Sequence, residues 1–153
     1  MATALLAAGC AGTPAMPVPA TSEPTRTTSD LRGAIAKLAL SMVGVTYRYG
    51  GADPQQGFDC SGLVFYTYTS NGHAVPRTSR DQFNAARKIP LAQAAEGDLV
   101  FFRDQEKLSH VGIYLGDRRF VHAPSSGRIV SVANIDASYY QRHLVAVGRL
   151  LPD

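Results

Sequence analysis

The sequence predicts an α+β domain in which N-terminal helices pack on an antiparallel sheet of five to six strands. Apolar residues recur at helical spacing in the first half of the chain, and from Asp98 onward they alternate with a period of two. Helices followed by a run of strands are typical of this fold class. The chain has 153 residues, of which 45% are hydrophobic and 18% are charged, so it can bury one core and is not generally disordered.

The first 29 residues are expected to precede the folded domain. Residues 1–10 resemble a truncated bacterial lipoprotein signal ending at Cys10, the residue that such proteins lipidate, and an ordinary alanine-rich N-terminus is the alternative. Residues 11–29 contain four prolines and almost no large apolar side chain, which is typical of a linker. Extended at ~3.1 Å per residue, such a linker would span roughly 60 Å. The folded domain is then residues 30–153.

The first helix is predicted to begin at Ser29 or Asp30, both good N-caps, and to end before Gly44. Its spacing places a set of apolar residues on one face. This set consists of Leu31, Ala34, Ile35, Leu38, Ala39 and Met42.

Two more helices follow a turn-rich stretch at residues 47–57. The second is predicted from Cys60 to Asn71, closed by Gly72. The third is short and is indicated by Ser79 with Gln82 three residues later, which is the pattern of a capping box.

Five strands are predicted in the second half of the chain, where Val, Ile, Phe and Tyr are frequent. They are Leu99 to Phe102, His110 to Leu115, Arg119 to Ala123, Ile129 to Ala133 and Val145 to Leu150. Between the last two strands, Tyr139 and Tyr140 are expected in the core or in the wall of a groove.

Cys60 lies where the glycine-rich turn gives way to the second helix. Unpaired backbone N–H groups and the helix dipole at such a position favour thiolate over thiol. His110 and His122 lie downstream in strand-like sequence. This layout is typical of a thiol nucleophile and its base. If Cys10 is lipidated, Cys60 has no disulfide partner and is a free thiol.

The loop between the second and third predicted strands decides whether His110 and His122 share a face of the sheet. An even-length loop would place the two imidazoles on opposite faces, whereas a loop of three or five residues, or a bulge, places them on the same face. The odd-length loop also leaves only apolar residues on the other face, namely Val111, Ile113, Leu115, Val121 and Ala123. We therefore predict an odd loop and a shared histidine face.

Composition excludes several classes of function. The net charge of +3 and the pI near 9.0 describe a mildly basic protein that would suit nucleic acid, an acidic membrane or a peptide-bearing wall, without choosing among them. The sequence contains no zinc-type Cys/His spacing, no Walker loop and no dinucleotide fingerprint. We therefore expect neither a metal nor a cofactor.

Six short blocks occur in a characteristic order along residues 30–150. They are Tyr47-Arg48-Tyr49-Gly50-Gly51, Phe58-Asp59-Cys60-Ser61-Gly62, Pro76-Arg77-Thr78-Ser79, Gly97-Asp98-Leu99-Val100-Phe101-Phe102, Ser109-His110-Val111-Gly112-Ile113-Tyr114 and Phe120-Val121-His122-Ala123. Through these blocks the chain resembles the NlpC/P60 family of cell-wall cysteine peptidases. The resemblance implies a papain-like fold, with the nucleophile at the N-terminus of a helix that packs on an antiparallel sheet.

The resemblance also implies roles for individual residues. Cys60 corresponds to the nucleophile, His110 to its base and His122 to the polar residue that orients the base. Tyr47, rather than Tyr49, corresponds to a tyrosine that binds substrate and helps to hold the oxyanion. The other substrate-side positions are Asp59, Ser61 and Ser79.

The implied reaction is acyl transfer from a peptidoglycan stem peptide through an acyl-enzyme. The bond would be D-γ-glutamyl to diaminopimelate or a diaminopimelate crosslink. An N-acetylmuramoyl-L-alanine amidase or related acyl-transfer enzyme and a non-catalytic murein-binding module are the alternatives. The expected protein is a monomer that does not bind nucleic acid. Its expected place is the periplasmic side of the cell envelope, where Cys10 would anchor it to the outer rather than the inner membrane.

Overall fold

The computed structural model describes residues 27–104, 107–126 and 129–152. The helices are α1 (Thr28–Ser41), α2 (Cys60–Thr69), α3 (Ser79–Ala85), the 3₁₀ turn η1 (Leu91–Gln93) and α4 (Ser138–His143). The strands are β1 (Ala52–Asp53), β2 (Gly57–Phe58), β3 (Arg87–Ile89), β4 (Leu99–Asp104), β5 (Lys107–Tyr114), β6 (Arg119–His122), β7 (Ser131–Asn134) and β8 (Leu144–Arg149). Six of the strands form one antiparallel sheet in the order β3-β8-β4-β5-β6-β7, and β1 and β2 form a separate pair. The predicted α+β class is confirmed.

Helix α1 begins earlier than predicted. Thr27 is the N-cap: its extended backbone lets its hydroxyl accept from the amide of Asp30 at 3.1 Å, while its own amide donates to the Asp30 carboxylate at 3.1 Å. Ser29 and Asp30 therefore lie in the first turn and are not the cap. Residues 28 and 29 belong to the helix and not to a linker. Residues 1–26, including Cys10, lie outside the described residues.

Helices α2 and α3 also differ from their predicted ends. Helix α2 stops at Thr69, before Asn71. Helix α3 is capped by the Thr78 hydroxyl, which accepts from the amide of Asp81 at 3.2 Å, so the predicted capping box of Ser79 and Gln82 is wrong. Gln82 is instead fully buried.

The buried Gln82 ties α3 to the start of α2. Its side-chain amide donates to the carbonyl of Ser61 at 3.0 Å and to the carbonyl of Pro76 at 2.9 Å. A buried amide held in this way positions the segment that joins α2 to α3.

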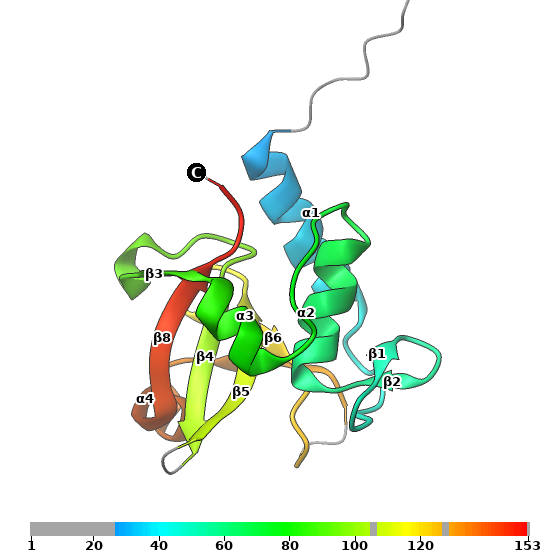
Figure 1. Ribbon diagram of the computed structural model, residues 1–153. Coiled ribbons are helices and arrows are strands. Elements are labelled where there is room, and N and C mark those ends of the chain that lie inside the picture. Colours follow the sequence, from blue (N-terminus) through cyan, green and yellow to red (C-terminus); the bar gives the residue numbers. More distant parts are fainter. Residues whose placement is uncertain (1–26, 105–106, 127–128, 153) are drawn as a thin grey trace, which may run out of the picture.

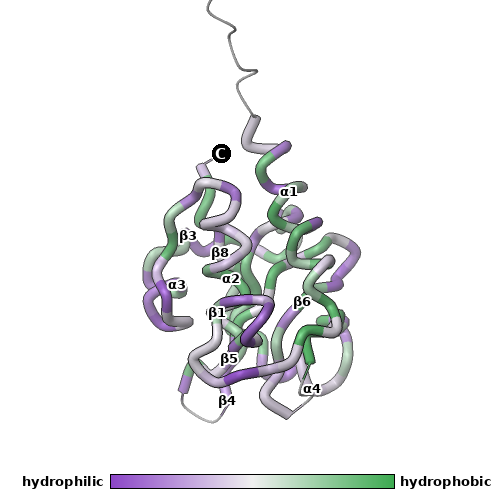
Figure 2. Tube along the Cα trace, turned by 90° about the vertical axis from the view of Figure 1, so that its right-hand side faces the viewer, coloured by the Kyte–Doolittle hydropathy of each residue, from purple (hydrophilic) through white to green (hydrophobic). Residues whose placement is uncertain are grey.

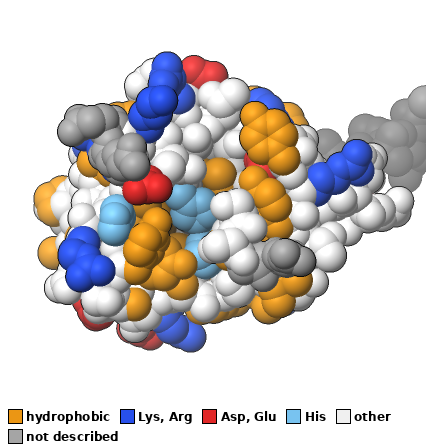
Figure 3. All heavy atoms as spheres, turned by 90° about the horizontal axis from the view of Figure 1, so that it is seen from below, with side chains coloured by type: hydrophobic (Ala, Val, Ile, Leu, Met, Phe, Trp, Pro, Cys, Tyr) orange, Lys and Arg blue, Asp and Glu red, His pale blue; other side chains and the backbone are white. Residues whose placement is uncertain are grey.

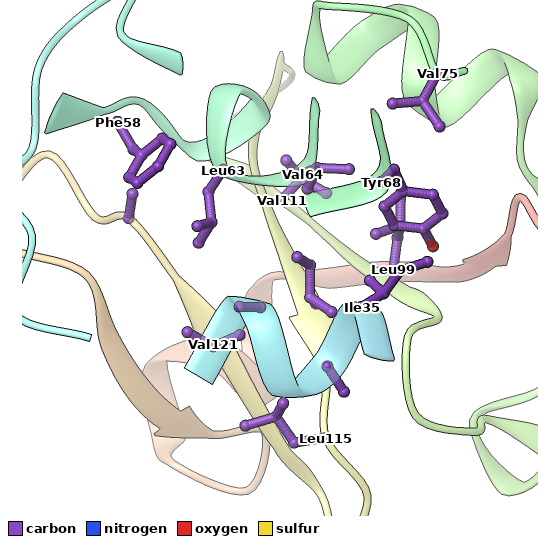
Figure 4. Close-up of a cluster of buried hydrophobic side chains, with 14 of the residues drawn as sticks. Ile35, Phe58, Leu63, Val64, Tyr68, Val75, Leu99, Val111, Leu115 and Val121 are labelled. Carbon is purple, nitrogen blue, oxygen red and sulfur yellow. The ribbon is translucent and has the colours of Figure 1, made fainter. Parts of the chain in front are cut away.

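Apolar side chains fill both faces of the sheet. On one face α1 and α2 pack against β4, β5 and β6, and Figure 4 shows Ile35 of α1 and Leu63 of α2 in this cluster. On the other face, Phe102 and Phe120 pack with Tyr140 of α4. Figure 1 shows α1 and α2 together on one side of the sheet, with α4 at the lower end of β8. The alternation of buried residues along the strands therefore separates two clusters.

The β5–β6 hairpin has the predicted odd loop. Ile113 pairs with Val121 and Tyr114 with Phe120, so Gly116, Asp117 and Arg118 form a three-residue loop between Leu115 and Arg119. All three residues have positive φ. This register places His110 and His122 on one face of the sheet, with the apolar set on the face covered by α1 and α2. The parity prediction is confirmed.

Strand β3 and helix α4 were not predicted. Strand β3 is a three-residue edge strand that pairs with β8 through Arg87, Lys88 and Ile89, and its sequence is largely polar. Helix α4 is six residues long and occupies the connection from β7 to β8. Both elements are short. Strand β3 depends on pairing with β8, and helix α4 depends on packing against the sheet, more than either depends on local propensity.

A buried ionic cluster joins the two ends of the domain. Asp98 is 1% exposed, and its carboxylate accepts from the guanidinium groups of Arg32 and Arg149, at 2.8 Å in each case. The Asp98 carboxylate thus ties α1 to β8 at the start of β4.

Hydrophobic positions are concentrated inside the molecule, whereas the loop near β1 is hydrophilic (Figure 2). Within the described residues, no helix has the length and apolar character needed to cross a membrane. The same residues contain no group of three or more His, Cys, Asp or Glu side chains suited to a metal ion.

Candidate active site

Cys60 is the first residue of α2 and follows the N-cap Asp59. The Asp59 carboxylate accepts from the amide of Gly62 at 2.6 Å and from the amide of Gly50 at 2.9 Å. Its two oxygens also bind the two terminal nitrogens of Arg77, at 3.0 and 2.9 Å. Burial alone would raise the pKa of Asp59, but the hydrogen bonds from Arg77 and Gly62 hold it below its ordinary value. An ionised carboxylate therefore fixes the turn that carries Cys60.

Close backbone packing explains two glycines around this turn. A Cβ on Gly62 would lie 1.9 Å from the carbonyl oxygen of Gly51, and a Cβ on Gly51 would lie 2.2 Å from the carbonyl oxygen of Gly57. The amide of Asp59 donates to the same Gly51 carbonyl at 3.0 Å. Only glycine permits this approach, which places the loop ahead of β1 directly against the first turn of α2.

The thiol of Cys60 faces strand β5. Helix α2 contacts β5, and among the described residues β6 pairs with β5 at Ile113 and Tyr114. The amide of Val111, next to His110 in the chain, donates to the Cys60 sulfur. Cys60 is a free cysteine. The nucleophile candidate therefore lies beside the strand that carries the base candidate.

Burial raises the pKa of the Cys60 thiol above its ordinary value, and the Asp59 carboxylate adds to the rise. The amides of Val111, Ser61 and Cys60 itself act in the opposite direction but do not outweigh burial. The amides at the helix N-terminus therefore favour thiolate, as expected, but burial outweighs them. The resting sulfur is a thiol.

His110 and His122 are in direct contact. Nε2 of His110 lies 2.7 Å from Nδ1 of His122. Burial lowers the pKa of His110 to about 4, and burial together with the His110 charge lowers that of His122 to about 3. Nε2 of His122 lies 3.4 Å from the Tyr140 hydroxyl and 3.5 Å from the Ser131 hydroxyl. Both rings are neutral at neutral pH, and Nδ1 of His110 is the ring nitrogen left for the thiol.

The sulfur opens into a cavity of about 510 Å³. Its lining includes every predicted substrate-side residue: Tyr47, Asp59, Ser61 and Ser79, together with Tyr49, Arg77 and Thr78. Burial, followed by the charges of Cys60 and Asp59, raises the pKa of Tyr47, so its hydroxyl keeps its proton and can donate. Tyr49 is 89% exposed at the edge of this cavity. Both tyrosines line the cavity, so the choice of Tyr47 over Tyr49 stays a prediction.

A second cavity of about 420 Å³ lies on the histidine side and meets the first at Ser109, which lines both. His110 and His122 lie in its wall, with Tyr139 and Tyr140 of α4, as the groove-wall expectation for these tyrosines required. Figure 3 shows histidine side chains near the middle of this face of the molecule, with hydrophobic side chains on both sides. Cys60 lines the first cavity and His110 the second, and we refer to the two together as the groove. We call them the cysteine-side and histidine-side cavities.

The sequence missed Arg77 as a member of the site, and it placed Tyr140 in the core or a groove wall without its contact to His122. Arg77 stands two residues before Ser79 within one of the ordered blocks, and that position was the available signal. Tyr140 had no comparable signal, because its contact with His122 depends on the placement of α4.

Comparison with known proteins gives a consistent set of relatives. The NlpC/P60 family matches residues 44–149, more than half of the chain. A bifunctional muramidase/DL-endopeptidase of Bacillus subtilis, CwlT, is 37% identical over 131 residues, which are 84% of this chain and 39% of that protein. The murein DD-endopeptidase MepH of Escherichia coli is 36% identical over 117 residues, 73% of this chain and 43% of that protein. The chain thus spans about two-fifths of the length of these relatives.

Solved structures agree with the sequence matches. A Staphylococcus aureus protein described as similar to a lipoprotein of the NLP/P60 family superposes with a TM-score of 0.75 at 33% identity. The match covers 86% of this chain and 45% of that one.

Proposed function

This chain belongs to the NlpC/P60 family, and from that premise we propose that it is a cysteine endopeptidase of peptidoglycan stem peptides. One observation carries the proposal: the thiol of Cys60 lies beside the strand that bears His110, and His110 is itself hydrogen-bonded to His122 at 2.7 Å. A thiol, a base within reach and a group that orients the base are the parts that nucleophilic catalysis requires.

The resting proton arrangement defines the first step. His110 accepts the thiol proton at Nδ1, which requires a proton on its Nε2 and an accepting Nδ1 on His122. His122 then carries its own proton on Nε2, facing the hydroxyls of Ser131 and Tyr140. The sulfur of Cys60 attacks the peptide carbonyl as its proton passes to His110, so that an S–C bond forms and the carbonyl oxygen becomes an oxyanion.

Two donors are available to the oxyanion. The backbone amide of Cys60 lies at the free N-terminus of α2, and the protonated hydroxyl of Tyr47 lines the same cavity. As the tetrahedral intermediate collapses, the C–N bond breaks and His110 gives its proton to the leaving amine. Water then attacks the thioester, with His110 as base, and releases the acid and the thiol.

The cysteine-side cavity holds the acyl half of the substrate. Ser79 and Tyr47 present hydroxyl groups to it, whereas Asp59 and Ser61 are already bonded within the protein: Ser61 donates to Asp59 at 3.1 Å and accepts from Arg77 at 3.0 Å. We assign Tyr47 and Ser79 direct contact with the peptide. Asp59, Ser61 and Arg77 form a polar wall of this cavity through their hydrogen bonds with one another.

The names of the relatives indicate that they cleave different peptide bonds. CwlT is described as a DL-endopeptidase and MepH as a DD-endopeptidase. For this chain we retain both candidate bonds, D-γ-glutamyl to diaminopimelate and the diaminopimelate crosslink.

Digestion of purified sacculi tests the function. The wild-type chain should release soluble stem-peptide fragments, and mass analysis of these fragments identifies the bond. Cys60→Ala should release none, whereas His73→Gln, a matched change at a histidine outside the groove, should digest at the wild-type rate. Hydrolysis that persists in Cys60→Ala would refute the catalytic proposal. Release of stem peptides from the glycan would instead indicate the amidase alternative.

The place of action is proposed to be the cell envelope, with a lipid on Cys10 as the anchor. The support is the sequence pattern at residues 1–10 and the envelope substrate. Labelling with radioactive palmitate in a bacterial host should mark the wild-type chain and not Cys10→Ala. Equal labelling of both would reject the anchor.

A further inference from the structure

Strand β5 contains a β-bulge next to the candidate base. In its pairing with β4, His110 lies opposite Phe102, whereas Leu108 lies opposite Arg103, the next residue of β4. Ser109 is therefore an extra residue of β5 that has no pairing partner on β4. A bulge bends its strand and changes the direction of the side chains around it, and bulges are frequent beside active sites. This bulge directly precedes His110.

Ser109 lies at the junction of the two cavities. It lines both the cysteine-side and the histidine-side cavity, and no other described residue does so. Ser109 is exposed, and its hydroxyl makes no hydrogen bond with another described residue. Ser61, by contrast, uses its hydroxyl within the protein, in bonds with Asp59 and Arg77. The Ser109 hydroxyl is therefore available to a bound peptide.

The scissile amide has to span this junction. Its carbonyl carbon is attacked by the sulfur of Cys60, which lines the cysteine-side cavity, and its nitrogen receives a proton from His110, which lines the histidine-side cavity. Three successive residues of β5 then meet the reacting groups. Val111 donates its amide to the sulfur, His110 presents its imidazole, and Ser109 presents its hydroxyl.

The leaving nitrogen needs a defined orientation. In the planar amide its lone pair is delocalised into the carbonyl group. When the S–C bond forms, the nitrogen becomes pyramidal, and its lone pair has to point at the proton on Nδ1 of His110 before that proton can move. The hydrogen that the nitrogen already carries must then point elsewhere. A serine oxygen can accept a hydrogen bond from such an N–H group.

We propose that Ser109 is a further catalytic residue, whose hydroxyl oxygen accepts from the N–H of the scissile amide and so directs the nitrogen lone pair towards His110. This inference rests on the proposed function. As the tetrahedral intermediate collapses, the proton moves from Nδ1 of His110 to the nitrogen, and the C–N bond breaks with its electron pair remaining on the amine. Ser109 keeps its own proton throughout and binds only the hydrogen that the nitrogen already carried.

Two substrates that differ at the scissile nitrogen test this role. The first is a soluble stem peptide with the bond that digestion of sacculi identifies. The second is its depsipeptide, in which an ester oxygen replaces the scissile N–H. Ser109→Ala should lower kcat/KM for the peptide by about 10-fold, the effect of one lost hydrogen bond, and keep kcat/KM for the depsipeptide within about 2-fold of wild type. Ser109→Thr retains the hydroxyl and should restore most of the peptide cleavage.

The depsipeptide distinguishes this role from two simpler ones. A hydroxyl that donated to the oxyanion, or one that only stabilised the bulge, would act on both substrates, because both contain the same carbonyl group. Ser70→Ala changes an exposed serine at the C-terminal end of α2 and is the matched control, which should keep both rates. Equal losses for the two substrates in Ser109→Ala, or an unchanged peptide rate, would overturn the role of Ser109. If that cleavage still required Cys60, the proposed function would stand.

Discussion

The two halves of the groove are held in place by different forces. Around Cys60, the Asp59 carboxylate, the Arg77 guanidinium and several backbone groups form hydrogen bonds with one another. The backbones of Gly51 and Gly62 also pack closely together. Around His110 and His122, ring packing dominates: Tyr140 lies 4.9 Å from Phe120, and Phe120 lies 4.9 Å from His122. Hydrogen bonds are directional and costly to leave half-made, whereas ring packing tolerates small changes.

The nucleophile and the histidine pair are therefore positioned by different kinds of interaction. The position of the nucleophile is set by a closed polar network, which fails as a unit when one member is lost. The histidine pair depends on hydrophobic support and on burial, which also determines its protonation state. Substitutions in the first half should therefore have larger effects than conservative substitutions in the second.

The largest effect is expected for Arg77→Met. The variant leaves the Asp59 carboxylate without its two guanidinium bonds, and it should lower the free energy of unfolding by about 2–4 kcal/mol and kcat/KM by about 100-fold. Urea unfolding and the cleavage rate of a soluble stem peptide measure the two quantities.

The control for this prediction is Arg118→Met. Arg118 pairs with Asp136 at 2.6 Å, but both side chains are about half exposed. The loss should stay below about 1 kcal/mol because water screens such a pair. Similar losses of unfolding free energy in the two variants would mean that the network around Cys60 stabilises the fold no more than an exposed ion pair does.

An intermediate effect is expected from pH. Because the pKa of His110 is about 4, kcat/KM should fall on the acid side with a midpoint near 4, where the base becomes protonated. A midpoint near the ordinary histidine value would show that burial does not set the protonation of this base.

Stability should follow the same two histidines. Their pKa values in the folded state, about 4 and about 3, lie below the unfolded value, so the unfolded chain binds protons first as the pH falls. The free energy of unfolding is unaffected by them above pH ~6.5 and decreases towards pH ~4, by up to about 1.4 kcal/mol per pH unit for each histidine. His122→Asn should make this slope shallower.

The smallest effect is expected for Tyr140→Phe. The change keeps the ring packing and removes only the hydroxyl 3.4 Å from Nε2 of His122. Because the Ser131 hydroxyl remains at 3.5 Å, kcat should fall by about 2- to 5-fold with little change in KM. Adding Ser131→Ala should then produce more than the product of the two single effects, since no hydroxyl would remain. A purely multiplicative result would show that neither hydroxyl orients His122.

The elements that the sequence could predict are those with a repeated pattern. Alternation along β5 and β6 was enough to infer an odd loop, because one residue more or less would have moved His110 and Val111 to the wrong faces. Local cap chemistry was less informative. Thr27, Ser29 and Asp30 are all capable N-caps, as are Thr78 and Ser79, and the choice between neighbours depends on backbone angles that composition does not reveal.

Contacts between distant segments account for most of what was missed. The resting protonation of Cys60 depends on burial against β5, which outweighs the helix N-terminus. Tyr140 reaches His122 only because α4 folds back over the sheet, and Arg77 reaches Asp59 across the connection between α2 and α3. None of these depends on a period or a propensity near the residue concerned.

The loop of Gly116, Asp117 and Arg118 affects the geometry of the active site from a distance. These residues touch neither the thiol nor the imidazole rings, yet their number sets the phase between the strands that carry the two histidines. The geometry requires a loop of this length. Other residues that accept positive φ can occupy the turn, whereas inserting or deleting one residue would rotate His122 away from His110. The number of residues in a surface turn thus helps to determine the geometry of the active site.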